Sequence, residues 1–162
     1  MSRQDYLAVA GRIRSGLTDL EEVADRVERI WSAGQLAGDD WHADAVALNL
    51  HGFYSAVERS LEIIAEAVDE AKPVGGDCHQ ALLSQMASEI PGIRPAVLNP
   101  ATRTHLDRYR GFRHVVRNVY SFNLDPQQIG LLVQLLPTAT AEATSDLAAF
   151  ARWLERIAGD AG

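Results

Sequence analysis

Apolar residues recur at steps of three and four along almost the whole chain, which is the period of an amphipathic α-helix. The first apolar line runs from Tyr6 to Trp31, and Gly34 is the residue expected to end this helix. A second helix is expected to begin near Asp40 and to end at the sequence KPVGG, residues 72–76. Each helix would have about 30 residues and be roughly 45 Å long. Two long helices joined by a short polar loop predict an antiparallel hairpin.

The segment after this hairpin predicts a shorter helix and a loop. The sequence DCHQALLSQMASEI, residues 77–90, places Asp77 where it would cap the first turn, and Pro91 follows directly. Three prolines within residues 91–101 then indicate a loop that passes over the end of the bundle.

Two further helices are expected in the rest of the chain. One starts near Pro100, and the last has Asp125 as its cap, Pro126 at its first position and Pro137 as an expected kink or division. The sequence HVVRNVYSF favours a strand locally, but no partner strand is evident. We therefore predict an all-α protein, in which residues 1–162 form a single domain. Its architecture would be a four-helix bundle with an extra short helix and a kinked C-terminal helix.

The composition narrows the classes of function. The formal net charge is -7, so general nucleic-acid binding is not expected, no DNA partner is expected, and any contact with a polyanion must be local. No run approaches the roughly 18 apolar residues that span a bilayer, and the N-terminus lacks a signal-peptide core, which suits a cytoplasmic protein without membrane contact.

Little in the sequence indicates a metal or a cofactor. Cys78 is the only cysteine, which rules out an internal disulfide and a zinc site built from paired cysteines. His79 beside it has no suitably spaced second ligand and is expected to have a structural role. The chain also lacks a Glu-x-x-His pair and a Gly-rich phosphate loop of the Walker type. We expect no metal and no cofactor.

The arginines gather in one short segment of this acidic chain. The stretch RYRGFRHVVRNVY, residues 108–120, contains four arginines and no acidic residue. At about 100° per residue, one half of this helix is apolar and should face the core. That half comprises Tyr109, Phe112, Val115, Val116, Val119 and Phe122. The other half is polar and comprises Arg110, Arg113, His114, Arg117, Asn118, Tyr120 and Ser121.

Two interpretations of the polar half stay open. A solvated basic face is the ordinary one. An anion site is the other, because arginines on one helix repel each other unless an anion or facing carboxylates neutralise them. In that case Glu58, on the second predicted helix, would orient Arg117 or Arg113. Glu58 and Glu62 fit an exposed acidic stripe at least as well.

A basic helix that follows a long helical hairpin resembles the HEPN superfamily, and more narrowly the HepT-like proteins. The HEPN signature is an arginine, usually followed by a polar residue, then four to six intervening residues and a histidine. HepT proteins add a tyrosine two residues beyond that histidine. Arg113, His114 and Tyr120 match the arginine, the polar residue and the tyrosine. The signature histidine falls on Asn118, so histidine and asparagine stand in inverted order.

The resemblance implies metal-independent RNA cleavage, in which a 2′-hydroxyl attacks the adjacent phosphate. Arg113 would hold the phosphate through bidentate hydrogen bonds, and Arg110 and Arg117 would add phosphate contacts. His114 would be the acid/base within the motif. Asn118 transfers no proton and would hold the substrate by hydrogen bonds.

The resemblance also implies partners besides RNA. Arg113 and Asn118 diverge by about 140° on one helix, so a homodimer with two motif helices facing each other would assemble the site more easily. A partner nucleotidyltransferase antitoxin would adenylylate Tyr120, which by position alone is a border residue with its ring in the core. The alternative function is a catalytically degenerate HEPN module that binds RNA, a nucleotide or its partner enzyme without cleaving. A third is a purely structural dimerisation bundle.

Overall fold

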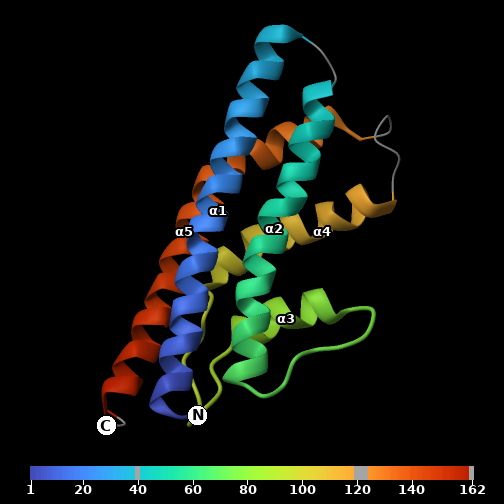
Figure 1. Ribbon diagram of the computed structural model, residues 1–162. Coiled ribbons are helices and arrows are strands. Elements are labelled where there is room, and N and C mark those ends of the chain that lie inside the picture. Colours follow the sequence, from blue (N-terminus) through green and yellow to red (C-terminus); the bar gives the residue numbers. More distant parts are fainter. Residues whose placement is uncertain (39–40, 119–123, 161–162) are drawn as a thin grey trace.

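The computed structural model describes residues 1–38, 41–118 and 124–160, apart from the side chain of residue 118. Five helices and no strand lie within these ranges (Figure 1). They are α1 (Arg3–Ala37), α2 (Trp41–Ala67), α3 (Cys78–Met86), α4 (Pro100–Asn118) and α5 (Pro126–Asp160). The predicted all-α fold, a bundle of four helices with one extra short helix, is confirmed.

The bundle is organised around α1, which packs along both α2 and α5. Figure 1 shows α1 and α2 as an antiparallel pair, with the two chain termini at the same end of the molecule. Helix α4 crosses the bundle and contacts α2 and α5, and α3 packs against α2 and α4. The predicted hairpin therefore forms one side of the fold, and α3 and α4 are held against its second helix. No helix within the described ranges is long and apolar enough to cross a membrane.

The end of the first helix differs from the prediction. Gly34 lies inside α1, and the helix ends at Ala37. Its C-cap is Gly38, which has the left-handed backbone conformation (φ 66°) that favours glycine. The reason for a glycine at position 34 is close packing between helices, because a Cβ there would stand 2.5 Å from the Cβ of His42. Gly34 thus lets α1 and α2 approach each other near their connection.

Helix α3 is shorter than predicted and ends at Met86, before Pro91. The following loop supplies hydrogen-bond donors for the last carbonyl of the helix. The backbone N–H groups of Val97 and Leu98 donate to the carbonyl of Met86, at 2.8 and 3.0 Å. Asp77 occupies the N-cap position as expected, but its side chain makes no capping hydrogen bond.

Helix α5 begins as predicted. The carboxylate of Asp125 accepts a hydrogen bond from the backbone of Gln127 at 2.9 Å, and Pro126 is the first helical residue. Pro137 lies within a continuous helix, and Figure 1 shows the first turns of α5 leaning away from the line of the rest. The proline therefore bends the helix without dividing it.

Two buried hydrogen-bond sites fix α4 on α5. At the start of α4, the carboxylate of Asp146 accepts hydrogen bonds from Asn99 and from the hydroxyl of Thr102, the latter at 2.6 Å. Further along, the hydroxyl of Tyr109 donates to the carbonyl of Leu132 at 2.7 Å. The apolar half of α4 faces the core as predicted, because Tyr109 and Phe112 are both buried. The arginine face must then point away from α5.

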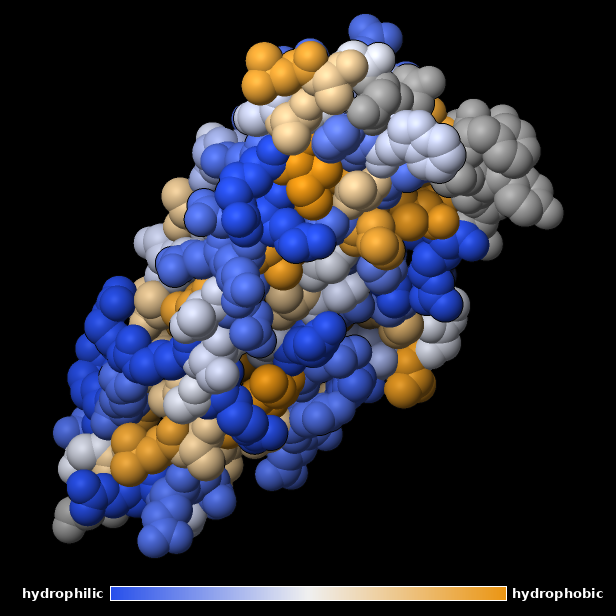
Figure 2. All heavy atoms as spheres, turned by 45° about the horizontal axis from the view of Figure 1, so that its top comes forward, coloured by the Kyte–Doolittle hydropathy of each residue, from blue (hydrophilic) through white to orange (hydrophobic). Residues whose placement is uncertain are grey.

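The surface carries several exposed apolar side chains. Figure 2 brings the α1–α2 connection forward and shows apolar patches among the polar surface at that end. Trp41 and Leu48 are among the exposed residues, and they lie seven residues apart on one face of α2.

Candidate functional site

The polar half of α4 forms one wall of a pocket of about 460 Å³. The other wall is the beginning of α3 and the residues before it. The lining residues are Gly76, Asp77, His79, Gln80, Arg110, Arg113, His114 and Arg117. Three guanidinium groups and two imidazoles against a single carboxylate make this a pocket for an anion.

A second hollow has the opposite character. It lies between α1 and α5, has a volume of about 690 Å³ and contains four acidic side chains, Glu21, Glu22, Asp25 and Glu28. No arginine, lysine or histidine lines it among the described residues. Its charge disfavours phosphate, so the smaller pocket is the candidate site.

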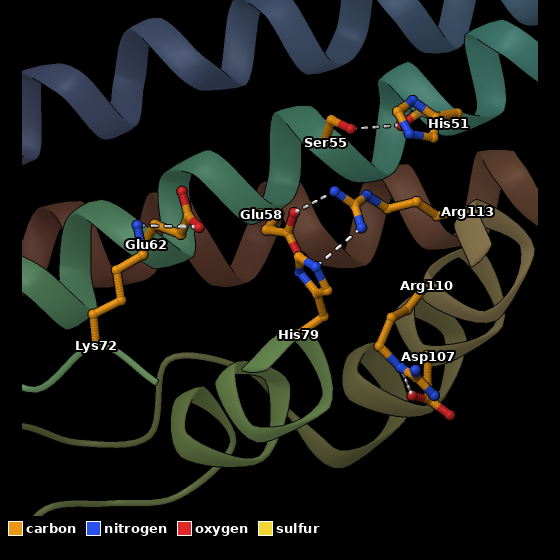
Figure 3. Close-up of polar contacts among 9 residues, drawn as sticks. All are labelled: His51, Ser55, Glu58, Glu62, Lys72, His79, Asp107, Arg110 and Arg113. Carbon is orange, nitrogen blue, oxygen red and sulfur yellow. Dashed lines mark hydrogen bonds and ion pairs between the residues drawn. The ribbon is translucent and has the colours of Figure 1, made fainter. Parts of the chain in front are cut away.

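A chain of three polar side chains joins α2, α3 and α4 at the back of this pocket (Figure 3). Oε1 of Glu58 lies 2.5 Å from Nδ1 of His79, and Nη1 of Arg113 lies 3.0 Å from Nε2 of the same ring. A direct ion pair between Nη2 of Arg113 and Oε2 of Glu58 is longer, at 4.0 Å. The histidine is therefore the closest link between the carboxylate and the guanidinium.

The partners of His79 determine its tautomer. An ionised carboxylate accepts hydrogen bonds only, so Nδ1 must carry the hydrogen that is shared with Glu58. A guanidinium donates only, so Nε2 must be the acceptor of the Arg113 N–H. This assignment is inferred from the hydrogen-bond partners. In this tautomer the hydrogen is on Nδ1, and the lone pair of Nε2 is directed at Arg113.

Burial strengthens these contacts. Glu58 is 6% exposed, so it does not belong to an exposed acidic stripe. Glu62, one turn further on α2, is half-buried and pairs with Lys72 at 3.2 Å instead. Of the two arginines that Glu58 was expected to orient, the one it contacts is Arg113, whose side chain is 17% exposed. Coulombic interactions are stronger at such a site than at the open surface.

Arg113 nevertheless has unused hydrogen-bonding capacity. Its Nε is buried and has no hydrogen-bond partner within the described ranges. The hydroxyl of Tyr54, buried on α2, is likewise without a described partner. Burial, followed by the charge of Glu58, raises the pKa of this hydroxyl, so Tyr54 stays neutral. A buried guanidinium with an unpaired donor favours an additional acceptor.

The remaining arginines of the pocket are more accessible. Nε of Arg110 donates to Asp107 at 2.6 Å, and that hydrogen bond raises the pKa of the guanidinium further. Arg117 and His114 are exposed at the edge of the pocket. Asn118 is the last residue of α4. Its side chain and all of Tyr120 lie outside the described residues.

A third histidine, His51 on α2, lies near the arginines of the pocket. His51 lies two turns before Glu58 on the side of α2 that faces Arg113 (Figure 3). Burial lowers the pKa of His51, and the charges of Arg113 and Arg117 lower it further. His51 is therefore neutral at pH 7.

His79 is the residue that sequence reasoning did not place in the site. It lies 34 positions before Arg113 and outside the arginine-rich motif. The sequence predicted only that His79 lies in the first turn of a helix capped by Asp77. It did not predict that this turn lies beside Arg113. No group of three or more histidine, cysteine, aspartate or glutamate side chains within the described ranges is arranged to hold a metal ion.

Comparison with protein families gives a match. A family model described as HepT-like protein matches residues 45–154. The match includes α3, α4 and nearly all of α2, and so contains every residue of the pocket. The resemblance inferred from the motif is thereby confirmed. Neither the curated proteins nor the solved structures give a match to the chain.

Proposed function

Because the chain belongs to the HepT-like protein family, we propose that it is a HEPN domain of toxin–antitoxin type that cleaves RNA without a metal ion. The observation that carries this proposal is the pocket between α3 and α4. Three arginines and two histidines line it, although the whole chain has a formal net charge of -7. A local positive pocket on an acidic protein can bind one phosphate group of an RNA chain, while the rest of the protein surface repels the other phosphates.

Arg113 is the residue proposed to hold the scissile phosphate. Its side chain lines the pocket and is 17% exposed, and a guanidinium can donate two parallel hydrogen bonds to the oxygens of a phosphate. Its buried Nε has no partner within the described ranges and would gain one if the side chain moved towards the phosphate. Arg110 and Arg117 would bind the same or a neighbouring phosphate from the open side of the pocket. These positive charges would stabilise the additional negative charge of the phosphorane.

Proton transfer within the motif falls to His114, which lines the pocket on the exposed side of α4. An imidazole can exchange protons with a substrate oxygen. Asn118 is proposed to hold the substrate by hydrogen bonds, since an amide does not transfer protons.

A homodimer is proposed as the working form, with two pockets arranged about a two-fold axis. The support is the exposed apolar pair Trp41 and Leu48, which share a face of α2. Leu48 lies one turn before His51, which interacts with the arginines of the pocket. A partner copy that covered these side chains would stand beside the arginine face.

The second proposed partner is a nucleotidyltransferase antitoxin that adenylylates Tyr120. Tyr120 follows α4 by two residues in the sequence, on the same segment as the arginines. An adenylyl group there would add a negatively charged phosphate near the pocket, and such a charge would compete with RNA for Arg113 and Arg117.

One observation favours a second candidate function. Asn118 stands where the family signature has its histidine. A protein with this departure could bind RNA, a nucleotide or its partner enzyme at the pocket without cleaving.

The test is incubation of purified protein with total RNA in the presence of EDTA. Cleavage by the wild type that is lost in Arg113→Ala and His114→Ala supports the ribonuclease. Arg14→Ala is the matched control, because Arg14 also pairs with a carboxylate, that of Glu155, but it joins α1 to α5 and does not line the pocket. RNA retention that depends on Arg113, without cleavage, supports the second candidate. If neither variant changes binding or cleavage, the site is wrongly assigned.

A further inference from the structure

We infer that His79, which lies outside the HEPN motif, is the general base of this site, and that Arg113 covers its reactive nitrogen until a phosphate binds. The inference rests on the proposed function and adds a residue from α3 to it. It gives the site a second proton-transferring group besides His114, which the motif itself does not supply because Asn118 stands where the family has a histidine.

The first argument is the orientation of the ring. Oε1 of Glu58 accepts the hydrogen bond of Nδ1–H at 2.5 Å, so Nε2 is the nitrogen that carries the lone pair. A carboxylate behind an imidazole fixes its orientation and stabilises the imidazolium that forms when the ring takes a proton. His79 also lines the pocket, and its side chain is 32% exposed. A substrate hydroxyl can therefore reach it.

The second argument concerns the hydrogen-bond donor that Nε2 of His79 has in this structure. Arg113 donates from Nη1 to Nε2 at 3.0 Å. A guanidinium binds a phosphate more strongly than a neutral nitrogen, because both partners are charged and two parallel hydrogen bonds form. A phosphate in the pocket would draw Arg113 away from the ring. The same event that binds the substrate thus exposes the base.

Charged and titratable groups from α2, α3 and α4 lie around the linked side chains of Glu58, His79 and Arg113. They are Glu58, Tyr54 and His51 on α2, Asp77 at the start of α3, and Arg110, Arg113, His114 and Arg117 on α4. Of the two carboxylates, Glu58 touches the ring directly.

The chemical step is balanced by two histidines. Nε2 of His79 accepts the proton of the 2′-hydroxyl while O2′ forms its bond to phosphorus. The bond between phosphorus and O5′ breaks, and protonated His114 gives its proton to O5′. The products are a 2′,3′-cyclic phosphate and a 5′-hydroxyl. His79 then returns its proton to solvent, and His114 takes one up.

Two substitutions at position 79 separate catalysis from folding. His79→Asn keeps an amide N–H near the position of Nδ1 and can still donate to Glu58, but it has no atom in place of Nε2. His79→Ala leaves a space beside Glu58 that added imidazole can fill. We expect cleavage to fall by about 10²- to 10⁴-fold in both variants. Binding of a fully 2′-O-methylated RNA, which has no nucleophile, should stay as tight as in the wild type.

Two further measurements distinguish a general base from a residue with a purely structural role. The wild-type rate should rise with pH on its acidic limb, and this limb should be absent in both variants. Added imidazole should restore part of the activity of His79→Ala. The matched control is His105→Ala, because Nδ1 of His105 pairs with Glu142 at 2.7 Å, with 28% of its side chain exposed, outside the pocket. This control should cleave as the wild type does.

The outcomes distinguish the two proposals. If the wild type cleaves RNA and both His79 variants cleave equally well, the inference is wrong and the proposed ribonuclease stands. If the wild type cleaves no RNA, the ribonuclease is wrong and the role of His79 falls with it. Nitrogen-15 shifts of the His79 ring give a check without RNA. A hydrogen on Nε2 instead of Nδ1 in the free protein at neutral pH would overturn the inference.

Discussion

Asp69→Ala should be the most informative stability change, because it removes the carboxylate that holds α3 in place. Asp69 follows α2 and accepts two hydrogen bonds from Arg94, at 2.5 Å from Nε and 2.7 Å from Nη2. Both side chains are 0% exposed. Arg94 also donates to the carbonyl of Gln85 near the end of α3. This pair therefore connects α2, the end of α3 and the loop that follows.

The magnitude follows from burial. Removing one partner of a buried ion pair leaves the other charge without compensation, at a cost of about 3–5 kcal/mol. The guanidinium of Arg94 would keep three backbone carbonyls as acceptors, at 2.9 to 3.1 Å, but no negative charge. In a chain of this size each kcal/mol lowers the melting temperature by roughly 2–4 °C. The expected decrease is therefore roughly 6–20 °C.

The matched control has the same hydrogen-bond geometry without the burial. Arg14 donates to both oxygens of Glu155, at 2.8 and 2.9 Å, but these side chains are 46% and 37% exposed. Glu155→Ala should leave the melting temperature almost unchanged, because exposed pairs contribute little. Both variants would be followed by thermal unfolding monitored by circular dichroism. If Asp69→Ala lowers the melting temperature no more than Glu155→Ala does, burial is not what makes the first pair important.

Three further predictions concern the core, the pH dependence and the oligomeric state. Tyr109→Phe should lower the unfolding free energy by about 1 kcal/mol in urea titrations, because its buried hydroxyl donates to a carbonyl of α5. Tyr54→Phe should cause a smaller loss, because its buried hydroxyl lacks a well-formed hydrogen bond and only lies near Glu58, and an equal loss would contradict the argument. The pKa of His51 is lowered on folding, so the unfolded chain takes up the proton first and stability should fall as pH drops below about 6.5. His51→Gln should show a smaller fall in urea titrations at each pH, and an identical fall would refute the assignment. Leu48→Glu should shift the protein towards monomer in sedimentation velocity, whereas Val74→Glu, at another exposed apolar position, should not. An unchanged distribution for Leu48→Glu would argue against the proposed dimer face.

The helices were predictable because their signals are local. Apolar period, the N-cap Asp125 and Pro126 at the first helical position all act within a few residues. The boundaries that were wrong depend on distant contacts. Gly34 is inside α1 because α2 approaches it there, and α3 ends at Met86 because a later loop satisfies its carbonyl. Neither contact produces a periodic pattern in the sequence from which it could be predicted.

The site was predictable only in part, for the same reason. The arginine face follows from the apolar period of α4, which fixes where the opposite side chains point. The position of α3 against that face does not follow, since it depends on tertiary contacts such as the buried pair of Asp69 and Arg94. His79 therefore had no visible connection with Arg113 in the sequence, although 3.0 Å separates their nitrogens in the fold.

The way in which this acidic chain pairs its arginines indicates where an anion would bind. Arg14, Arg94 and Arg110 each have a carboxylate oxygen within 2.8 Å, so their charges are neutralised locally. Arg113 differs, because its carboxylate is 4.0 Å away and the Nε2 nitrogen of His79 occupies the closest position. Burial makes its incomplete neutralisation costly, and a phosphate would relieve that cost. The arginine with the least complete pairing of these four thus lies in the pocket that also contains two histidines, where the proposed cleavage would use the arginine to hold a phosphate and the histidines to transfer protons.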